Sequence, residues 1–395
     1  MRIKEKIENY APQAIEIRHQ LHQNPELGYE EYETTARIKK ELESYGIEIQ
    51  ELPDLKTGVV ALIRGDFPGK TVALREDIDA LPLEEVTGLS FASQKSGVSH
   101  ACGHDVHCAS LLLTAHVLQD LKHELHGNVR LIFQPAEEKI TGAQTVVKTG
   151  IMQMEPKANS MIGVHVSPEF QAGTIAVIKG PANASTDSIS ITVVGKGGHG
   201  AHPYRCVDPI VTAAYMLTQL QSIISRENPA VQPAVLTFGT IHGGTAFNVI
   251  PETVELQGTL RTFNEEGRHK MWQAIERIAT CSCEAMRAHA IVKISEGVPA
   301  LVNDAGVIDN IIQAAKKTIG ADHIITLENP SLGSDDFSVF LNYCPGAQFR
   351  IGSANLDPLS QIGLHNPANI FDDHAIITAA QVMVQYVIDI CQPDV

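Results

Sequence analysis

The apolar pattern of the first 180 residues predicts strands that alternate with helices. Residues 3–45 carry isoleucine and leucine at roughly helical spacing, so we expect helical structure there, interrupted at Pro25. The apolar run Cys108–Leu118 predicts a buried helix. Short apolar runs predict strands at Val59–Ile63, Thr71–Leu74, Asn128–Phe133 and Met161–Val166. This alternation is typical of an α/β domain.

A change of pattern near residue 180 predicts a second, smaller domain. Its predicted elements are strand Ser188–Val194, helix Pro209–Ile224, strands Ala234–Ile241 and Thr253–Thr262, helix Glu265–Ala288 and strand Ala290–Ile294. The order β-α-β-β-α-β is that of a ferredoxin-like split βαβ sandwich. We therefore expect an inserted domain over residues 183–297.

The first pattern returns after residue 297. We expect a helix at Val307–Ile319, a strand at Ala347–Ile351 and a closing amphipathic helix at Ile376–Ile390. The α/β domain is therefore predicted to be discontinuous, built from residues 1–182 and 298–395.

Charge and cysteine content narrow the class of protein. The 395-residue chain has a formal net charge of −16, which argues against nucleic acid or an anionic membrane as a main partner. Its seven cysteines are odd in number and too sparse for a disulfide scaffold. The N-terminal segment lacks the apolar core of a signal peptide. We expect a cytoplasmic protein with free thiols.

The stretch Ser99–His107 is the densest group of metal-ligand side chains in the chain. It holds three imidazoles, one thiol and one carboxylate within nine residues. Gly103 lets the backbone turn so that Cys102 and His104 can reach one point, and both are ordinary zinc ligands. Asp105 is placed to cap the helix that follows. The alternative from this stretch alone is a buried thiol beside scattered histidines.

Four further residues carry possible chemistry, three of them after strands and one within a strand. Glu137 and Glu138 follow the strand Asn128–Phe133, and on an extended segment they would point opposite ways, one toward a metal and one toward a water. Asp79 follows another strand and could orient a metal-bound histidine. His165 lies within an apolar strand. Taken singly, each of these is more often a surface or core residue.

Eight segments in order resemble the amidohydrolase branch of the aminoacylase and carboxypeptidase metallohydrolase family. The segments are Leu21–Leu27, Ala73–Pro82, His100–His107, Gln134–Glu138, Gly195–Gly200, Gly243–Pro251, Gly333–Phe337 and Leu364–Pro367. The resemblance covers nearly the whole chain. It implies a mixed-sheet α/β/α catalytic domain with the inserted domain acting as a lid and as the contact of a homodimer, with a tetramer left open.

The resemblance also implies a role for each site residue. The ligands of two divalent ions (Mn, Zn, Co or Ni) would be Cys102, His104, Glu138, His165 and His365, with Cys102 bridging both ions. Glu137 would be the general base, and Asp79 would orient a ligand, as would His107 in a supporting position. His199 and Asn248 would complete the site from the lid. Four positions depart from the usual family pattern: Glu76, His202, Tyr204 and Asp335.

The implied activity is hydrolysis of the amide bond of N-acetyl or aryl-acyl amino acids by a metal-activated water. A dipeptidase or carboxypeptidase using the same site is the nearest alternative. A thiol-based redox or binding protein using Cys102 is an alternative of another class, and a non-catalytic binding protein is a third. The expected partner is a small-molecule substrate.

Overall fold

The computed structural model describes residues 2–393, which divide into two compact units. The first unit comprises residues up to Ala182, then Val302–Pro330, and then the chain from Asp335 onward. The second unit comprises Asn183–Leu301 and Ser331–Ser334. Each unit has its own apolar core.

The first unit is built on an eight-stranded mixed sheet with the order β1-β2-β4-β3-β5-β16-β6-β15. The central neighbours β4, β3, β5 and β16 run parallel, and antiparallel pairs lie toward both edges. This confirms the predicted mixed α/β class. The strands are β1 Glu48–Ile49, β2 Val59–Arg64, β3 Phe67–Asp77, β4 His126–Gln134, β5 Ser160–Gln171, β6 Ile175–Val177, β15 Ile324–Thr326 and β16 Gly346–Ala354.

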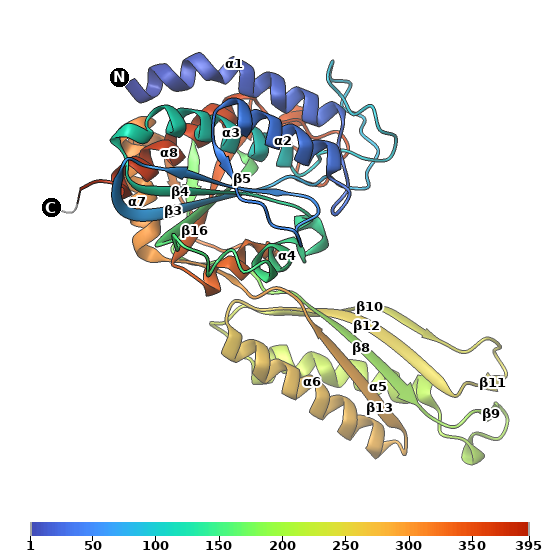
Figure 1. Cartoon of the computed structure of the whole chain (residues 1–395). Helices are drawn as coiled ribbons and strands as arrows, with labels where there is room; N and C mark the ends of the chain where they lie inside the picture. Colours follow the sequence, from blue (N-terminus) through green and yellow to red (C-terminus); the bar gives the residue numbers. More distant parts are fainter. Residues whose placement is uncertain (1, 394–395) are drawn as a thin grey trace. The chain divides into compact units, whose positions relative to one another are not determined.

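Helices cover both faces of this sheet. Figure 1 shows α1, α2 and α3 on one face and α4 on the other. Helix α3 packs beside α1 and α8, and its whole first half is buried. The helices are α1 Arg2–Gln23, α2 Tyr32–Ser44, α3 His104–Asp120, α4 Gly142–Lys148, α7 Ala305–Thr318 and α8 His374–Ile390, with short turns η1 Lys122–Glu124, η2 Glu137–Lys139, η5 Ala321–His323, η6 Asp336–Asn342 and η7 Pro358–Gln361.

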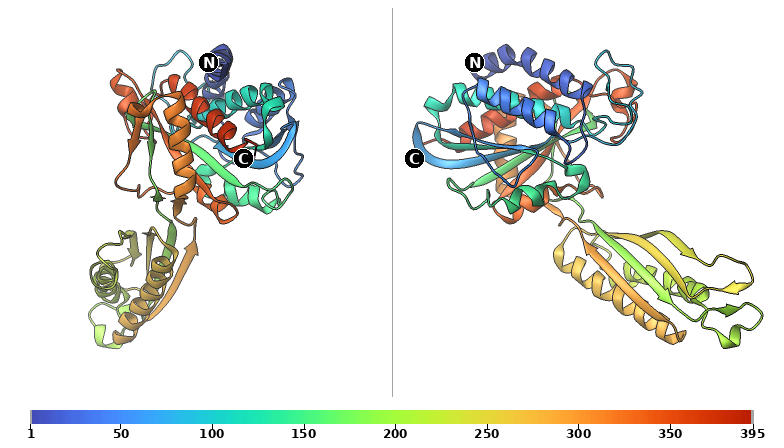
Figure 2. Two further views of the ribbon diagram at one scale, coloured as in Figure 1. Left: turned by 90° about the vertical axis from the view of Figure 1, so that its left-hand side faces the viewer. Right: turned by 45° about the vertical axis from the view of Figure 1, so that its right-hand side comes forward.

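The second unit has a four-stranded antiparallel sheet with the order β10-β12-β8-β13. Figure 2 shows α5 and α6 side by side against this sheet. Alternate residues Ile189, Ile191 and Val193 of β8 point into the core with these helices. The elements are β8 Asp187–Val194, β9 Gly198–His199, η3 Pro203–Arg205, α5 Pro209–Ser222, the π-helix η4 Ile223–Glu227, β10 Val235–Gly243, β11 Val249–Ile250, β12 Thr253–Arg261, α6 Glu265–Ala285 and β13 His289–Glu296.

Two short strands stand where the chain passes from one unit to the other. They are β7 Gly180–Asn183 and β14 Leu301–Asn303, and they pair with each other in a two-stranded sheet. Among the described residues, none of the helices is long and apolar enough to span a membrane.

Candidate metal centre

The loop before α3 places two metal-ligand side chains at the end of the sheet. Gly103 has a left-handed backbone (φ 79°) and serves as the N-cap of α3. A Cβ at Gly103 would lie 2.6 Å from Val166 Cγ2, so the loop can approach β5 only with glycine here. Cys102 and His104 are both buried, and Cys102 Sγ lies 3.7 Å from His165 Nε2.

Hydrogen bonds decide which nitrogen of each histidine is free. His165 Nδ1 lies 2.8 Å from the carbonyl oxygen of Val166, which can only accept, so Nδ1 carries the proton. His104 Nδ1 lies 3.2 Å from Asp79 Oδ1 and donates to that carboxylate in the same way. The Nε2 atom of each imidazole therefore keeps its lone pair for a cation.

The two adjacent glutamates lie in a tight turn, which differs from the extended segment that we expected. Glu137 and Glu138 open the 3₁₀ turn η2, directly after β4. Left-handed residues stand on both sides of the turn, Ala136 at φ 55° and Ile140 at φ 57°. Such backbone conformations are costly outside glycine and are concentrated at functional sites.

Asp79 links two of the expected ligands. Besides its contact with His104, Asp79 Oδ2 accepts the backbone N–H of Glu138 at 3.0 Å. Glu138 Oε1 then lies 3.2 Å from His365 Nε2 and 4.0 Å from His104 Nε2. One carboxylate thus positions a side chain from the α3 loop and the turn after β4.

His365 is brought to the site by its backbone. Its φ of 61° is left-handed, and its N–H donates to the carbonyl oxygen of Ala101 at 3.0 Å. This bond joins the His365 loop to the residue before Cys102. The side chain of His365 is half-exposed, unlike the other expected ligands.

The structure brings all five expected ligands into overlapping groups. Within each group the candidate ligand atoms lie within 4.8 Å of one another; the groups are Cys102, His104 and His165; Cys102, Glu138 and His365; His104, Glu137 and Glu138; and Asp77, His104 and His107. Because Cys102 belongs to the first two groups, its sulfur is placed where it can be shared between two cations.

The donor atoms fit divalent metal ions. His104 Nε2 is buried and has no hydrogen-bond partner within residues 2–393, and Glu138 Oε1 faces imidazole nitrogens, His365 Nε2 at 3.2 Å and His104 Nε2 at 4.0 Å. Buried polar atoms are normally satisfied, so an unpartnered imidazole nitrogen beside a thiol sulfur and a carboxylate oxygen indicates a cation. A mixed set of sulfur, nitrogen and carboxylate oxygen suits Zn²⁺ and related first-row ions.

The environment of Cys102 disfavours the thiol-enzyme alternative. Burial raises the pKa of the Cys102 thiol well above its usual value. Reactive cysteines are instead exposed and have a lowered pKa. A cation would have to displace this proton on binding.

Glu137 lies beside two more carboxylates. Its carboxyl group forms a cluster with Asp335 and Asp336, in which the oxygens lie within 4.8 Å of one another. Burial, and then the charges of Asp335 and Asp336, raise the pKa of Glu137 well above its usual value. A carboxyl group of raised pKa is suited to accept and return a proton near neutral pH.

Arg75 holds this region together and was not among our predicted site residues. Its fully buried guanidinium donates to Gln134 Oε1 at 2.7 Å, to Asp77 Oδ2 at 2.8 Å and to Asp336 Oδ1 at 3.0 Å. It thereby ties β3, the end of β4 and η6 together. An arginine directly after the apolar run Thr71–Leu74 was the available sequence signal.

His107 lies next to the ligand histidines but has no free nitrogen. Its Nδ1 donates to Asp77 Oδ1 at 2.6 Å, and its Nε2 accepts the backbone N–H of Val166 at 2.8 Å. Both ring nitrogens are used by the protein, so His107 supports the site without a lone pair for a cation.

The prediction that Asp105 caps α3 is wrong, because Gly103 occupies the N-cap position. Asp105 is buried in the first turn and accepts from Arg18 Nε at 2.8 Å and from His22 Nδ1 at 2.9 Å. Burying a carboxylate without charged partners costs more free energy than leaving a helix N-terminus without a side-chain cap.

His199 and Asn248 lie side by side in the second unit. The paired strands β9 and β11 place Val249 opposite His199, and Gly200 N–H donates to the carbonyl oxygen of Asn248 at 2.9 Å. The N–H of Ala201 donates to His199 Nδ1 at 3.1 Å. His199 Nε2 is then the protonated nitrogen of the neutral ring, and its side chain is exposed.

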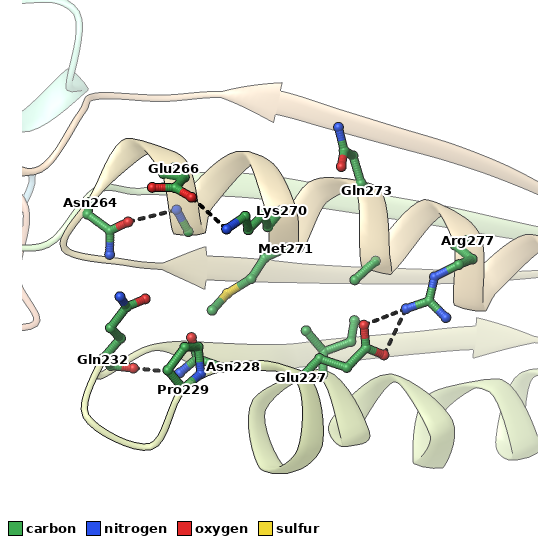
Figure 3. A pocket seen from close by; sticks show the side chains of 13 residues that line it. Glu227, Asn228, Pro229, Gln232, Asn264, Glu266, Lys270, Met271, Gln273 and Arg277 are labelled. Carbon is green, nitrogen blue, oxygen red and sulfur yellow. Dashed lines mark hydrogen bonds and ion pairs between the residues drawn. The ribbon is translucent and has the colours of Figure 1, made fainter.

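A pocket of about 510 Å³ in the second unit lacks, among the described residues, the unpaired buried donor atoms that mark the candidate metal centre. It lies between α6 and the segment formed by η4 and the loop after it, and its charged side chains face one another (Figure 3). Glu227 pairs with Arg277 at 2.5 Å and Glu266 with Lys270 at 2.6 Å, all on the surface. No unpaired buried group of the described chain points into it.

Comparison with known proteins identifies the family. The model of Peptidase family M20/M25/M40 matches residues 73–389. The chain belongs to this family. Membership, together with relatives named as deacetylases and as an amidohydrolase, identifies it as a hydrolase of amide C–N bonds and confirms the predicted resemblance to the amidohydrolase branch of the family.

Among its relatives in the family, some are named as carboxypeptidases and others as deacetylases. Thermostable carboxypeptidase 2 of Saccharolobus solfataricus is 40% identical over 357 residues, covering 90% of this chain and 89% of the relative. N-acetylcysteine deacetylase of Bacillus subtilis is 38% identical over 367 residues, covering 93% and 94%. A solved dinuclear metal-binding M20 peptidase of B. subtilis has a TM-score of 0.84 at 34% identity, covering 97% of this chain and 99% of that chain.

Proposed function

We propose that this protein hydrolyses the amide bond of N-acyl amino acids with two divalent ions and Glu137 as general base. The observation that carries the proposal is the pair of ligand groups that share Cys102, with Glu137 adjoining them. A relative named N-acetylcysteine deacetylase supports this substrate class.

The five side chains would divide between two ions. Cys102, His104 and His165 would hold one ion, and Cys102, Glu138 and His365 the other. The mixed donor set is compatible with Mn, Zn, Co or Ni. When bound, such ions supply positive charge for the substrate carbonyl oxygen and lower the pKa of a bound water.

The residues of the chain provide the proton transfers. Glu137 takes a proton from the attacking water and returns it to the nitrogen of the leaving amino acid. Burial and the nearby Asp335 and Asp336 raise the pKa of Glu137, which suits it to both steps. Asp79 keeps His104 in the tautomer whose Nε2 is free.

His199 and Asn248 are proposed to contact the acyl part of the substrate. The protonated Nε2 of His199 can donate to an oxygen that gains negative charge in the transition state. The Asn248 amide can donate beside it. The support is their neighbouring placement, His199 on β9 and Asn248 directly before β11, and the exposure of both side chains.

The second unit is proposed to form the contact of a cytoplasmic homodimer. Strands β10 and β13 are the edges of its sheet and present unpaired backbone groups. The loop before β11 carries a fully exposed Phe247, and η3 carries an exposed Tyr204. Exposed aromatic residues are enriched in protein interfaces.

The test is a hydrolysis screen on protein loaded with Mn, Zn, Co or Ni. We expect release of free amino acid from N-acetyl or aryl-acyl amino acids. Glu137→Gln should keep metal and fold but lose about two to four orders of magnitude in turnover, the size expected of a positioned acid–base group. Near wild-type turnover in this variant would reject the assignment.

A carboxypeptidase activity at the same site is the second candidate, because a relative of that name is 40% identical. Dipeptides and N-blocked dipeptides belong in the same screen. A kcat/KM for blocked dipeptides above that for simple N-acyl amino acids would favour the carboxypeptidase.

A further inference from the structure

The central sheet divides beside the candidate metal centre. Strands β3 and β5 pair from Val72 opposite Ser160 to Arg75 opposite Gly163, and there their ladder ends. Beyond this point β3 continues along β4 and β5 continues along β16. The residues of β5 that follow Gly163 therefore lose their main-chain partner on the β3 side.

Side chains replace that partner. Glu76 Oε1 accepts the backbone N–H of Val164 at 3.0 Å, and His107 Nε2 accepts that of Val166 at 2.8 Å. These two amides flank His165, one of the proposed ligands. The backbone on either side of His165 is thus held by one side chain from β3 and one from α3.

Glu76 is suited to this contact as an uncharged group. Its side chain is 0% exposed, and its Oε2 has no hydrogen-bond partner in the part of the chain that is described. Burial, and then the charge of Asp77, raise the pKa of Glu76 well above its usual value. An amide side chain of the same shape would provide the same acceptor.

We propose that Glu76 is a positioning residue whose Oε1 takes the place of the missing strand partner of Val164 and sets the position of His165. The inference rests on the proposed function, because it concerns a ligand of the proposed metal centre. His165 Nε2 lies 3.7 Å from Cys102 Sγ, and both atoms would bind the same ion. A shift of His165 would therefore change the binding of that ion. Partners behind a ligand typically change metal affinity by about 10–100-fold.

Calorimetric titration of metal-free protein with Mn²⁺ or Zn²⁺ tests the inference. Glu76→Gln keeps the acceptor, whereas Glu76→Met keeps the volume and removes it. We expect Glu76→Gln to bind both ions as the wild type does. In Glu76→Met one of the two binding steps should weaken by about 10–100-fold and the other should stay within about threefold. Glu76→Ala should repeat the weakened step if the Met variant folds poorly.

A matched control comes from the same unit. Glu26 is also a buried carboxylate that accepts a backbone N–H, that of Thr34 at 2.8 Å, but it serves the start of α2. Glu26→Met should lower the melting temperature of the metal-free protein and leave both binding steps unchanged. Weaker metal binding in Glu26→Met would assign the effect to general loss of stability and overturn the inference.

The outcomes separate the inference from the proposed function. A wild-type protein that binds no divalent ion would overturn both. Two binding steps in the wild type, unchanged in Glu76→Met and Glu76→Ala, would overturn only the role of Glu76. Equal weakening in Glu76→Gln and Glu76→Met would show that the charge of the carboxylate matters, which also overturns it.

Discussion

The imidazoles near the centre differ in how many nitrogens the protein already uses. His104 and His165 each commit Nδ1 to an oxygen and leave Nε2 free. His107 commits both nitrogens. The difference between His104 and His107, which lie one turn apart on α3, therefore comes from their neighbours: Asp79 after β3 for His104, and residues of β3 and β5 for His107.

A pH-dependent contribution to stability should come from Glu31. Its side chain is buried, and Oε1 accepts the N–H of Ala136 at 2.8 Å. Burial raises the pKa of Glu31 from 4.5 to about 7. Because the folded-state pKa lies above the unfolded value, the stabilisation is complete below about pH 4.5 and is lost as the pH rises through about 7.

Glu31→Gln should flatten this pH dependence. We expect the metal-free variant to melt several degrees above the wild type at pH 8 and near it at pH 5, since the amide is neutral throughout. Thermal denaturation followed by circular dichroism between pH 5 and 8 measures this. A difference in melting temperature between the two proteins that stays the same from pH 5 to 8 would contradict the assignment.

The chemistry of single residues was visible in the sequence, but their partners were not. Cys102 and His104 stand in one short motif, so their convergence could be predicted from spacing. Whether His107 binds metal depends on Asp77 and Val166, which the fold brings from other strands. Arg75 was not predicted as a site residue for the same reason, because two of its three partners, Gln134 and Asp336, come from other elements.

Among the elements, the loop before α3 depends on a glycine, Gly103, for both its backbone conformation and its approach to β5. Gly103→Ala should cost about 1–2 kcal/mol of stability from the left-handed backbone alone. It should further weaken metal binding at least tenfold, because the new Cβ would lie 2.6 Å from Val166 Cγ2. Denaturant unfolding and calorimetric metal titration give the two quantities.

Gly97→Ala is the matched control for this change. Gly97 has nearly the same φ, 74°, but its added Cβ would meet nothing within 4 Å. We expect a similar backbone cost and unchanged metal affinity. Loss of affinity in both variants would mean that backbone strain, and not the contact with β5, controls the loop.

Strand and helix positions were largely predictable, whereas the turn after β4 was not. The apolar run Asn128–Phe133 lies within β4, and the run Cys108–Leu118 lies within α3. The left-handed residues around Glu137 and Glu138 are alanine and isoleucine, which carry no signal for that conformation. Tertiary contacts, such as the hydrogen bond that the N–H of Glu138 donates to Asp79, add to the turn's own backbone hydrogen bonds.

At the scale of the molecule, the two separate cores should respond differently to metal. The proposed ligands all belong to the first unit, and none to the core of the second. Metal at 100 times its dissociation constant should stabilise the first unit by about 2.7 kcal/mol. Hydrogen exchange should show new protection in β3, β5 and α3, and unchanged exchange in β8 and β12. Equal protection in both units would contradict this.

We predicted an inserted domain over residues 183–297. The contacts in the structure define a unit with slightly different limits. The unit extends to Leu301 and includes Ser331–Ser334. The latter segment joins it through long-range bonds: Ala184 N–H donates to Ser331 O at 3.1 Å, and Arg261 Nη1 donates to Ser334 Oγ at 2.9 Å. No pattern of neighbouring residues in the sequence predicts either of these hydrogen bonds.

The pairing of β7 with β14 has an evolutionary consequence. The chain leaves the first unit through β7 and returns to it through β14, and these two strands lie next to each other. The side-chain amide of Asn303, on β14, donates hydrogen bonds to the carbonyl oxygens of Ile178 and Gln348. An insert whose longest segment begins and ends at two adjacent points can change in length by recombination while its host still closes around its own core. The junction thus lets the smaller unit diversify outside the turns that carry His199 and Asn248, while the ligand set of its host stays fixed.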